Sequence, residues 1–162
     1  MQMCNAEIMK KIKLLEITKN EILNDESRTH QVTYQTEKDK VDYGYSFGKT
    51  REKITAIDDE VRKLKRLLNH SNATTMVEDF SMTLGECLVY LAQLNREIGV
   101  LQHMARKEPT VRHSTYNGVI EYTTLNYDKA ECQERLDWVQ GTISQLQIAI
   151  DRTNLTNMIQ MD

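Results

Sequence analysis

The amino-acid sequence predicts a mainly α-helical protein: an antiparallel four-helix bundle with an internal pseudo-twofold repeat and one small β-hairpin. Three observations support this fold class. Four stretches place apolar residues at alternating steps of three and four, which is the spacing of a helix that buries one face. The 162 residues include a single proline, so long helices meet few breakers. The two halves of the sequence also match each other in the same order of elements. A chain of this length predicts one helical domain that spans residues 1–162.

The N-terminal part of the chain predicts the first helix and a long connector. The apolar stripe of this helix consists of Ile8, Ile12, Leu15 and Ile22. Lys19 interrupts the stripe, and Asn5 is a candidate N-cap. About twenty mostly polar residues follow, from Asp25 to Phe47, and connectors this long in compact domains are usually functional or mobile.

The second and third helices are predicted over about Gly48–Asn69 and Thr83–Lys107. The second stripe is Ile54, Ile57, Val61, Leu64 and Leu68, and the third is Cys87, Leu91, Leu94, Ile98, Leu101 and Ala105. Thr83 and Glu86 are spaced as a capping box, which predicts the start of the third helix. Pro109 lies just beyond its end.

A β-hairpin and the fourth helix complete the chain. Asn117-Gly118 lies between β-favouring residues and predicts a hairpin over about Arg112–Leu125. The fourth helix is predicted over about Asp128–Asp151, after a capping box of Asp128 and Glu131. Its stripe is Cys132, Leu136, Val139, Ile143, Leu146 and Ile150.

The internal repeat is clearest where the second and fourth helices end. The segment from Leu68 matches the segment from Ile150, an offset of 82 residues, with identical Asn, Thr and Met residues. The same offset places the second apolar stripe on the fourth, and Tyr45 on Tyr127. We therefore expect pseudo-repeats over residues 1–80 and 83–162, packed with pseudo-twofold symmetry.

Each repeat ends in a segment rich in Ser, Thr and Asn, which has two interpretations. The residues concerned are Ser71, Asn72 and Thr74 in the first repeat, and Arg152, Thr153, Asn154 and Thr156 in the second. Asn tolerates the left-handed conformation that ends many helices, so the segment could be a paired helix stop. Alternatively, both Asn carboxamides line one polar pocket or interface.

These two segments carry a family resemblance. Leu68–Thr75 and Ile148–Asn157 resemble the matching segments of a small bacterial family of helical proteins of unknown function, some members of which are labelled septicolysin. The resemblance implies a helical fold and a bacterial source. The label suggests a membrane-active toxin.

Composition and motifs exclude several classes of protein. A formal charge of −3 and a pI near 5.8 speak against a nucleic-acid partner held by a basic face. The longest apolar run is Cys87–Ala92, far short of a membrane span. Three cysteines without paired spacing indicate reduced thiols in the cytoplasm rather than a disulfide framework or a zinc site. Phosphate-binding loops and nucleophile elbows are also missing, so we expect no cofactor.

We therefore expect a non-enzymatic, cytoplasmic protein that acts through homo-oligomeric assembly, as a dimer or a higher oligomer. The candidate interface residues are Tyr116, Asn117, Gly118, Tyr122 and Trp138, because exposed aromatic residues and strand edges are typical of contact surfaces. A ligand-binding protein or enzyme is the first alternative, with a polar site formed by His30, His113 and the connector tyrosines. A toxin is the second, and it depends on the family label alone.

Overall fold

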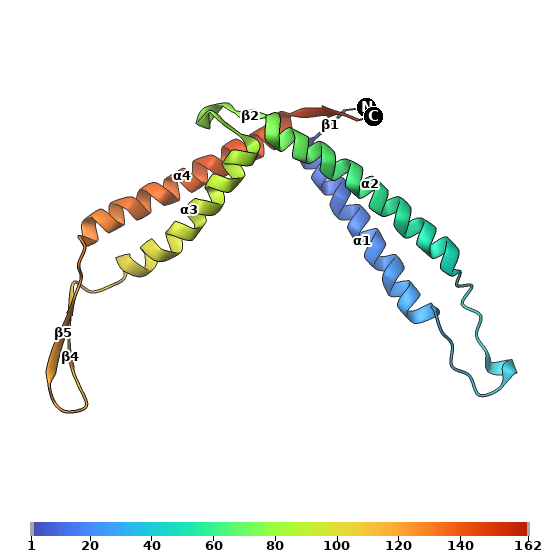
Figure 1. The fold of residues 1–162 in the computed structure, drawn as a ribbon, viewed down its shortest axis with the longest axis horizontal. Coiled ribbons are helices and arrows are strands. Elements are labelled where there is room, and N and C mark those ends of the chain that lie inside the picture. Colours follow the sequence, from blue (N-terminus) through green and yellow to red (C-terminus); the bar gives the residue numbers. More distant parts are fainter. Residues whose placement is uncertain (1, 162) are drawn as a thin grey trace. The chain divides into compact units, whose positions relative to one another are not determined.

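The computed structural model describes residues 2–161 and contains four long helices with short strand pairs at their ends (Figure 1). The helices are α1 (Asn5–Thr29), α2 (Phe47–Thr74), α3 (Leu84–Ala105) and α4 (Lys129–Thr156). The strands are β1 (Gln2–Cys4), β2 (Met76–Val77), β3 (Met82–Thr83), β4 (Thr110–Ser114), β5 (Ile120–Thr124) and β6 (Met158–Gln160). The predicted mainly helical class, the four helices and the hairpin are confirmed.

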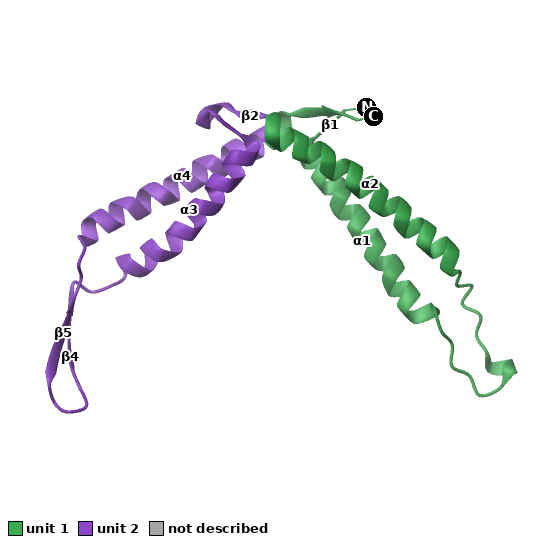
Figure 2. Ribbon diagram, in the orientation of Figure 1, with its two compact units in different colours: residues 1–74, 154–162 green, residues 75–153 purple. Residues whose placement is uncertain are grey.

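The chain divides into two compact units, residues 1–74 with 154–162 and residues 75–153 (Figure 2). The first unit contains α1 and α2, and its strands β1 and β6 pair antiparallel near the two chain ends. The second contains α3, most of α4, the pair β2–β3 and the hairpin β4–β5. The strand after α2 thus belongs to the second unit, and the strand after α4 belongs to the first.

Each unit has its own hydrophobic core. In the first, Ile8, Ile12 and Leu64 are buried between α1 and α2. In the second, nine buried residues pack mainly between α3 and α4: Val77, Leu84, Cys87, Leu94, Val139, Ile143, Leu146, Ala149 and Ile150. The predicted stripes therefore face the other long helix of their own unit. The predicted single bundle around one core is not confirmed, because the buried hydrophobic residues form these two clusters.

The contact between α1 and α2 contains polar pairs where the apolar stripe is interrupted. Lys19, which breaks the stripe in sequence, places its Nζ 2.6 Å from Oδ1 of Asp58. Near the end of α1, Glu26 forms an ion pair with Arg51. Ion pairs between two helices favour one register, since a slip along the helix axis would separate the paired charges.

Three helix ends differ from the prediction. Cys4, not Asn5, is the N-cap of α1, and its backbone N–H donates to Oε2 of Glu7 at 2.8 Å. The helices α2 and α4 continue to Thr74 and Thr156, about five residues further than the stripes predicted. The capping box of Thr83 and Glu86 is confirmed, with both reciprocal hydrogen bonds present.

Candidate functional site

A cluster of polar side chains in the first unit joins α1, α2 and the C-terminal segment. Asn5 is fully buried at the start of α1, and its Oδ1 accepts a hydrogen bond from Oγ of Ser71 at 3.0 Å. Its Nδ2 donates to Oδ1 of Asn154 at 3.2 Å. Nδ2 of Asn157 donates to Oγ of Ser71 at 2.9 Å and lies 3.4 Å from Oδ1 of Asn5. Buried amides need such partners, so the cluster holds the end of α4 against α1 and α2.

The predicted helix-stop role of the two asparagines is wrong. Asn72 and Asn154 each lie two residues inside a helix, and neither has a positive φ angle. Only Asn154 joins the polar cluster. Asn72 is half-buried and makes no side-chain hydrogen bond within residues 2–161.

The other residues of the two polar segments have separate local roles. Thr74 and Thr153 each donate to the backbone carbonyl four residues earlier, at 2.9 and 2.8 Å. The guanidinium of Arg152 donates to Oδ2 of Asp79 at 2.5 Å in the second unit. Thr156 is an exposed residue at the end of α4. The structure therefore brings Ser71 and Asn154 together but not the whole predicted set.

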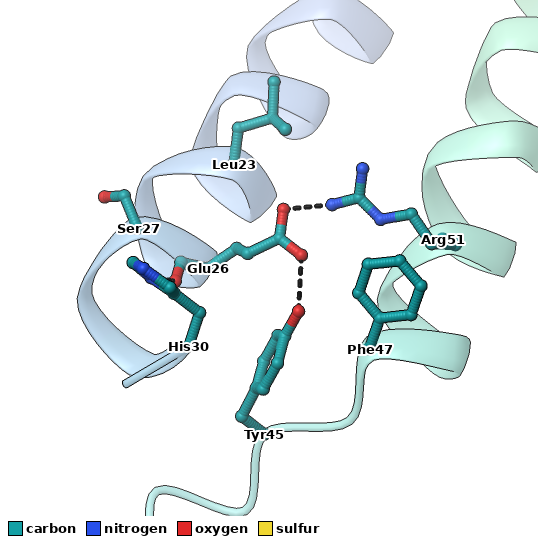
Figure 3. A pocket seen from close by; sticks show the side chains of 7 residues that line it. All are labelled: Leu23, Glu26, Ser27, His30, Tyr45, Phe47 and Arg51. Atoms are coloured by element: carbon teal, nitrogen blue, oxygen red, sulfur yellow. Dashed lines mark hydrogen bonds and ion pairs between the residues drawn. The ribbon is translucent and has the colours of Figure 1, made fainter. Parts of the chain in front are cut away.

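A pocket of about 570 Å³ lies where the end of α1 meets the start of α2 (Figure 3). Its lining residues are Leu23, Glu26, Ser27, His30, Tyr45, Phe47 and Arg51. The Tyr45 hydroxyl donates to Oε1 of Glu26 at 2.7 Å, and Arg51 binds the other carboxylate oxygen. The guanidinium of Arg51 also lies 5.4 Å from the centre of the Phe47 ring. Glu26 thus fastens both the connector and α2 to the end of α1.

These contacts change the acid–base properties of the pocket. The hydrogen bonds from Tyr45 and then Arg51 lower the pKa of Glu26 below its ordinary value, because both donors favour the charged carboxylate. The same carboxylate raises the pKa of Tyr45, since the phenol is a donor only while it is protonated. One polar atom of the pocket lacks a hydrogen bond: Nε of Arg51 is buried and has no acceptor within the described chain.

The two histidines of the predicted connector site belong to different units of the chain. His30 lines the pocket in the first unit, where its Nδ1 lies 2.9 Å from the backbone oxygen of Glu26. His113 lies on β4 in the second unit, 3.5 Å from the carboxylate of Glu121 on β5. Within residues 2–161, no three His, Cys, Asp or Glu side chains are grouped so that they could hold a metal ion.

The hairpin β4–β5 carries most of the predicted interface residues. Tyr116 and Asn117 occupy the centre of its turn, and Gly118 follows with φ of +76°. The backbone N–H of Gly118 donates to the carbonyl of Thr115 at 2.9 Å, which closes the turn. All ten strand residues are exposed, Tyr122 among them. The hairpin extends beyond the ends of α3 and α4 (Figure 1).

Trp138, the remaining predicted interface residue, lies on α4 and is half exposed. The guanidinium of Arg135 lies 4.4 Å from the centre of its ring and forms an ion pair with Glu97 of α3. The indole therefore already has an intramolecular partner on one face.

Sequence reasoning missed Asn157, Glu26 and Arg51, and it gave Asn5 only the role of an N-cap. Asn5 and Glu26 continue the three-and-four spacing of the first apolar stripe in both directions, so polar residues at stripe positions were the available signal. A periodicity search that accepts apolar residues alone cannot detect them.

Comparison with known proteins supports the fold and leaves the function open. No known protein family and no curated protein matches the sequence. In the described chain, no helix combines the length and apolar character that a membrane crossing requires. A crystal structure of a functionally unknown conserved protein from Corynebacterium diphtheriae is similar over 99% of this chain and 100% of its own, with 16% sequence identity and a TM-score of 0.70. That likeness shows a shared fold, whereas the resemblance to the septicolysin-labelled family stays a prediction.

Proposed function

We propose that this protein acts through self-assembly, and that two copies join along the outer edge of β5. One observation carries the proposal: β4 and β5 form a two-stranded sheet in which both faces are exposed and no other described strand pairs with either edge. An isolated hairpin is marginally stable in water, and open strand edges are templates for further pairing.

The hydrogen-bond pattern shows which backbone groups the edges offer. At the turn, the backbone N–H of Thr115 donates to the carbonyl of Val119. At the opposite end of the hairpin, the backbone N–H of Leu125 donates to the carbonyl of Pro109. Hydrogen-bonded and non-hydrogen-bonded pairs alternate along an antiparallel ladder, so the pair of Arg112 and Tyr122 between them is non-hydrogen-bonded. The backbone N–H and C=O of both residues therefore point outward, Arg112 on the β4 edge and Tyr122 on the β5 edge.

Symmetry favours the β5 edge. When two identical strands pair antiparallel about a twofold axis, the central residue faces its own copy. On β4 this residue is Arg112, and two arginines would repel each other. On β5 it is Tyr122, and an aromatic pair is favourable at this position.

Oligomer mass in solution tests this proposal with a pair of matched variants. Tyr122→Pro removes the outward N–H of β5, and Arg112→Pro removes the equivalent N–H of β4 without breaking a bond inside the hairpin. We expect analytical ultracentrifugation to show a lower mass for Tyr122→Pro and an unchanged mass for Arg112→Pro. An unchanged mass for Tyr122→Pro, or equal losses in both variants, would contradict association through β5.

We also propose that the chain is a tandem duplication that forms one helical domain. Two further features support the repeat. The helices α2 and α4 contain 28 residues each. Tyr45 and Tyr127 each precede one of these helices by two residues. The hydroxyl of each donates a hydrogen bond to the preceding helix: that of Tyr45 to Glu26, and that of Tyr127 to the carbonyl of Met104.

All three cysteines are buried free thiols, which supports a reducing, cytoplasmic environment.

Ligand binding in the α1–α2 pocket is a second candidate function, favoured by Nε of Arg51, which lacks an acceptor within the described residues. The apolar walls of Leu23, Tyr45 and Phe47 fit a small aromatic carboxylate. We expect a titration with benzoate to shift the NMR signal of the Arg51 Nε–H group, and Arg51→Lys to abolish binding. A signal that does not move at millimolar benzoate would exclude this ligand class.

A further inference from the structure

The helix α3 is more apolar than its contact with α4 requires. Only Glu86, Arg96 and Glu97 are charged among its 22 residues. The side that packs against α4 consists of Leu84, Cys87, Leu91, Leu94, Ile98 and Leu101. Yet Leu88, Val89 and Val100 are 42%, 59% and 61% exposed. A helix that is apolar on several sides is usually covered on more than one of them.

These exposed side chains belong to one continuous surface, which we call the outer face of α3. It comprises Gly85, Leu88, Val89, Ala92, Arg96, Gly99, Val100 and His103. At 3.6 residues per turn these positions lie on the side of the helix away from the α4-facing stripe. A Cβ atom added at Gly99 would meet nothing within 4 Å, so the surface is open at this position.

We propose that the outer face of α3 packs antiparallel against the same face of a second copy of this chain. The inference deepens the proposed self-assembly and rests on it for the identity of the partner. It adds a second interface on a different element from the β5 edge.

The positions of these residues along α3 support a second copy of the same helix as the binding partner. When two antiparallel α3 helices meet through their outer faces, with the centre of the contact at the level of Leu94 along the helix axis, residues at equal distances in sequence before and after Leu94 face each other. The facing pairs are then Gly85 with His103, Leu88 with Val100, Val89 with Gly99, and Ala92 with Arg96. Every member of the face meets another member, and three of the four pairs join a small residue to a large one. Alternation of this kind lets helices interdigitate without voids.

Charge supports the antiparallel direction. Glu86 is the charged residue in the first turn of α3, whereas Arg106 and Lys107 outnumber Glu108 just beyond its end. Antiparallel packing places the acidic start of one helix beside the basic end of the other, and it also opposes the two helix dipoles. Arg96 lays its methylene groups over Ala92 of the other copy and leaves its guanidinium at the rim.

Two twofold interfaces on one chain produce assemblies larger than a dimer. We therefore expect at least four copies in the wild-type assembly. Blocking either interface alone should leave a dimer held by the other interface, and blocking both should leave a monomer.

The test uses Gly99→Lys, with Gly141→Lys on α4 as the matched control. Both glycines lie inside helices with open space around the position of a Cβ atom, and lysine favours helix more than glycine does. Only Gly99→Lys places a long charged side chain where Val89 of the second copy would pack. Circular dichroism confirms that both variants are folded, and analytical ultracentrifugation measures their mass.

We expect a dimer for Gly99→Lys, a dimer for Tyr122→Pro, a monomer for the double variant and the wild-type mass for Gly141→Lys. A monomer for Tyr122→Pro alone, or the wild-type mass for Gly99→Lys, would overturn the α3 interface while leaving β5 association intact. A wild-type dimer that only Gly99→Lys dissociates would support α3 and overturn β5. A monomeric wild-type protein would overturn both proposals, and equal dissociation by Gly141→Lys would overturn the assignment to α3.

Discussion

The side-chain amide of Asn5 donates a hydrogen bond to the side-chain oxygen of Asn154, although the two residues lie at opposite ends of the chain. Asn5 begins α1, and Asn154 lies in the last turn of α4. Because Ser71 also bonds to Asn5, one buried carboxamide joins three segments of the first unit. This bond makes the C-terminal segment part of the first unit's structure rather than an appendage.

Asn5→Ala should therefore lower the free energy of unfolding of the first unit by about 1–3 kcal/mol, the cost of leaving buried polar partners unsatisfied. Urea unfolding followed by circular dichroism measures the change. Asn72→Ala is the control, because Asn72 makes no side-chain hydrogen bond among the described residues and should change stability by less than about 0.5 kcal/mol. Equal effects in the two variants would contradict a special role for Asn5.

Glycine at position 72 tests the corrected position of Asn72 within α2. A helix stop in the left-handed conformation would tolerate Gly better than Ala. Asn72 instead has no positive φ and lies before the end of α2, so Asn72→Gly should be less stable than Asn72→Ala, by about 0.5–1 kcal/mol. Thermal unfolding of the two variants decides the order, and a more stable glycine variant would restore the helix-stop interpretation.

The carboxylate of Glu26 should make stability depend on acid pH. Its pKa is lowered in the folded protein, chiefly by the hydrogen bond from Tyr45 and then by that from Arg51. The unfolded state therefore binds the proton more readily, so this contribution is present above the ordinary pKa of about 4.5 and is lost as the pH falls below it. We expect Glu26→Gln to lower the melting temperature at pH 7.

At lower pH the same substitution should have a smaller effect, because the wild-type carboxyl takes up a proton as the pH falls through its lowered pKa and then loses the charge that the variant lacks at every pH. Glu60, Glu86 and Glu97 also have lowered pKa values, so the wild-type protein loses stability over the same range for other reasons. Only the difference between wild type and variant isolates Glu26. A difference in melting temperature that is independent of pH would contradict this assignment.

Periodicity was sufficient to predict the helices and their facing stripes, and the Asn117-Gly118 pair was sufficient to predict the hairpin. Both signals are local, since they depend on residues a few positions apart. The polar cluster and the pocket depend on partners such as Asn5 with Asn154, and Glu26 with Arg51, that are distant in sequence. The sequence pattern around a polar residue does not show which distant side chain forms its hydrogen bond or ion pair. The division into two cores was missed for the same reason, because the stripes of all four helices are equally compatible with one shared core.

Lys19 and Asp58 provide a test of register within the first unit. Both side chains are about one-third exposed and their charged atoms lie 2.6 Å apart, so we expect a coupling of about 0.2–1 kcal/mol. Lys19→Asp and Asp58→Lys should each lower the melting temperature, since each places like charges across the α1–α2 contact. The double variant should recover most of the loss, because it restores the pair in reverse. A double variant that is less stable than either single variant would show that the pair does not contribute to this contact.

Gly118 links the local structure of the hairpin to the proposed assembly. Its φ of +76° is a conformation that a β-branched residue adopts only under strain, so Gly118→Val should weaken the turn between β4 and β5. Every residue of the two hairpin strands is exposed and none belongs to either core, so the melting temperature should change little. Amide hydrogen exchange should instead accelerate at Thr115 and along β5. If the β5 edge joins two copies, the oligomer mass should fall in the same variant. Gly48→Val, which replaces a glycine with open space around it in α2, is the control and should leave both the exchange of β5 and the mass unchanged. Rapid exchange of β5 without any loss of mass would separate the hairpin from assembly and assign the contact between copies to another element.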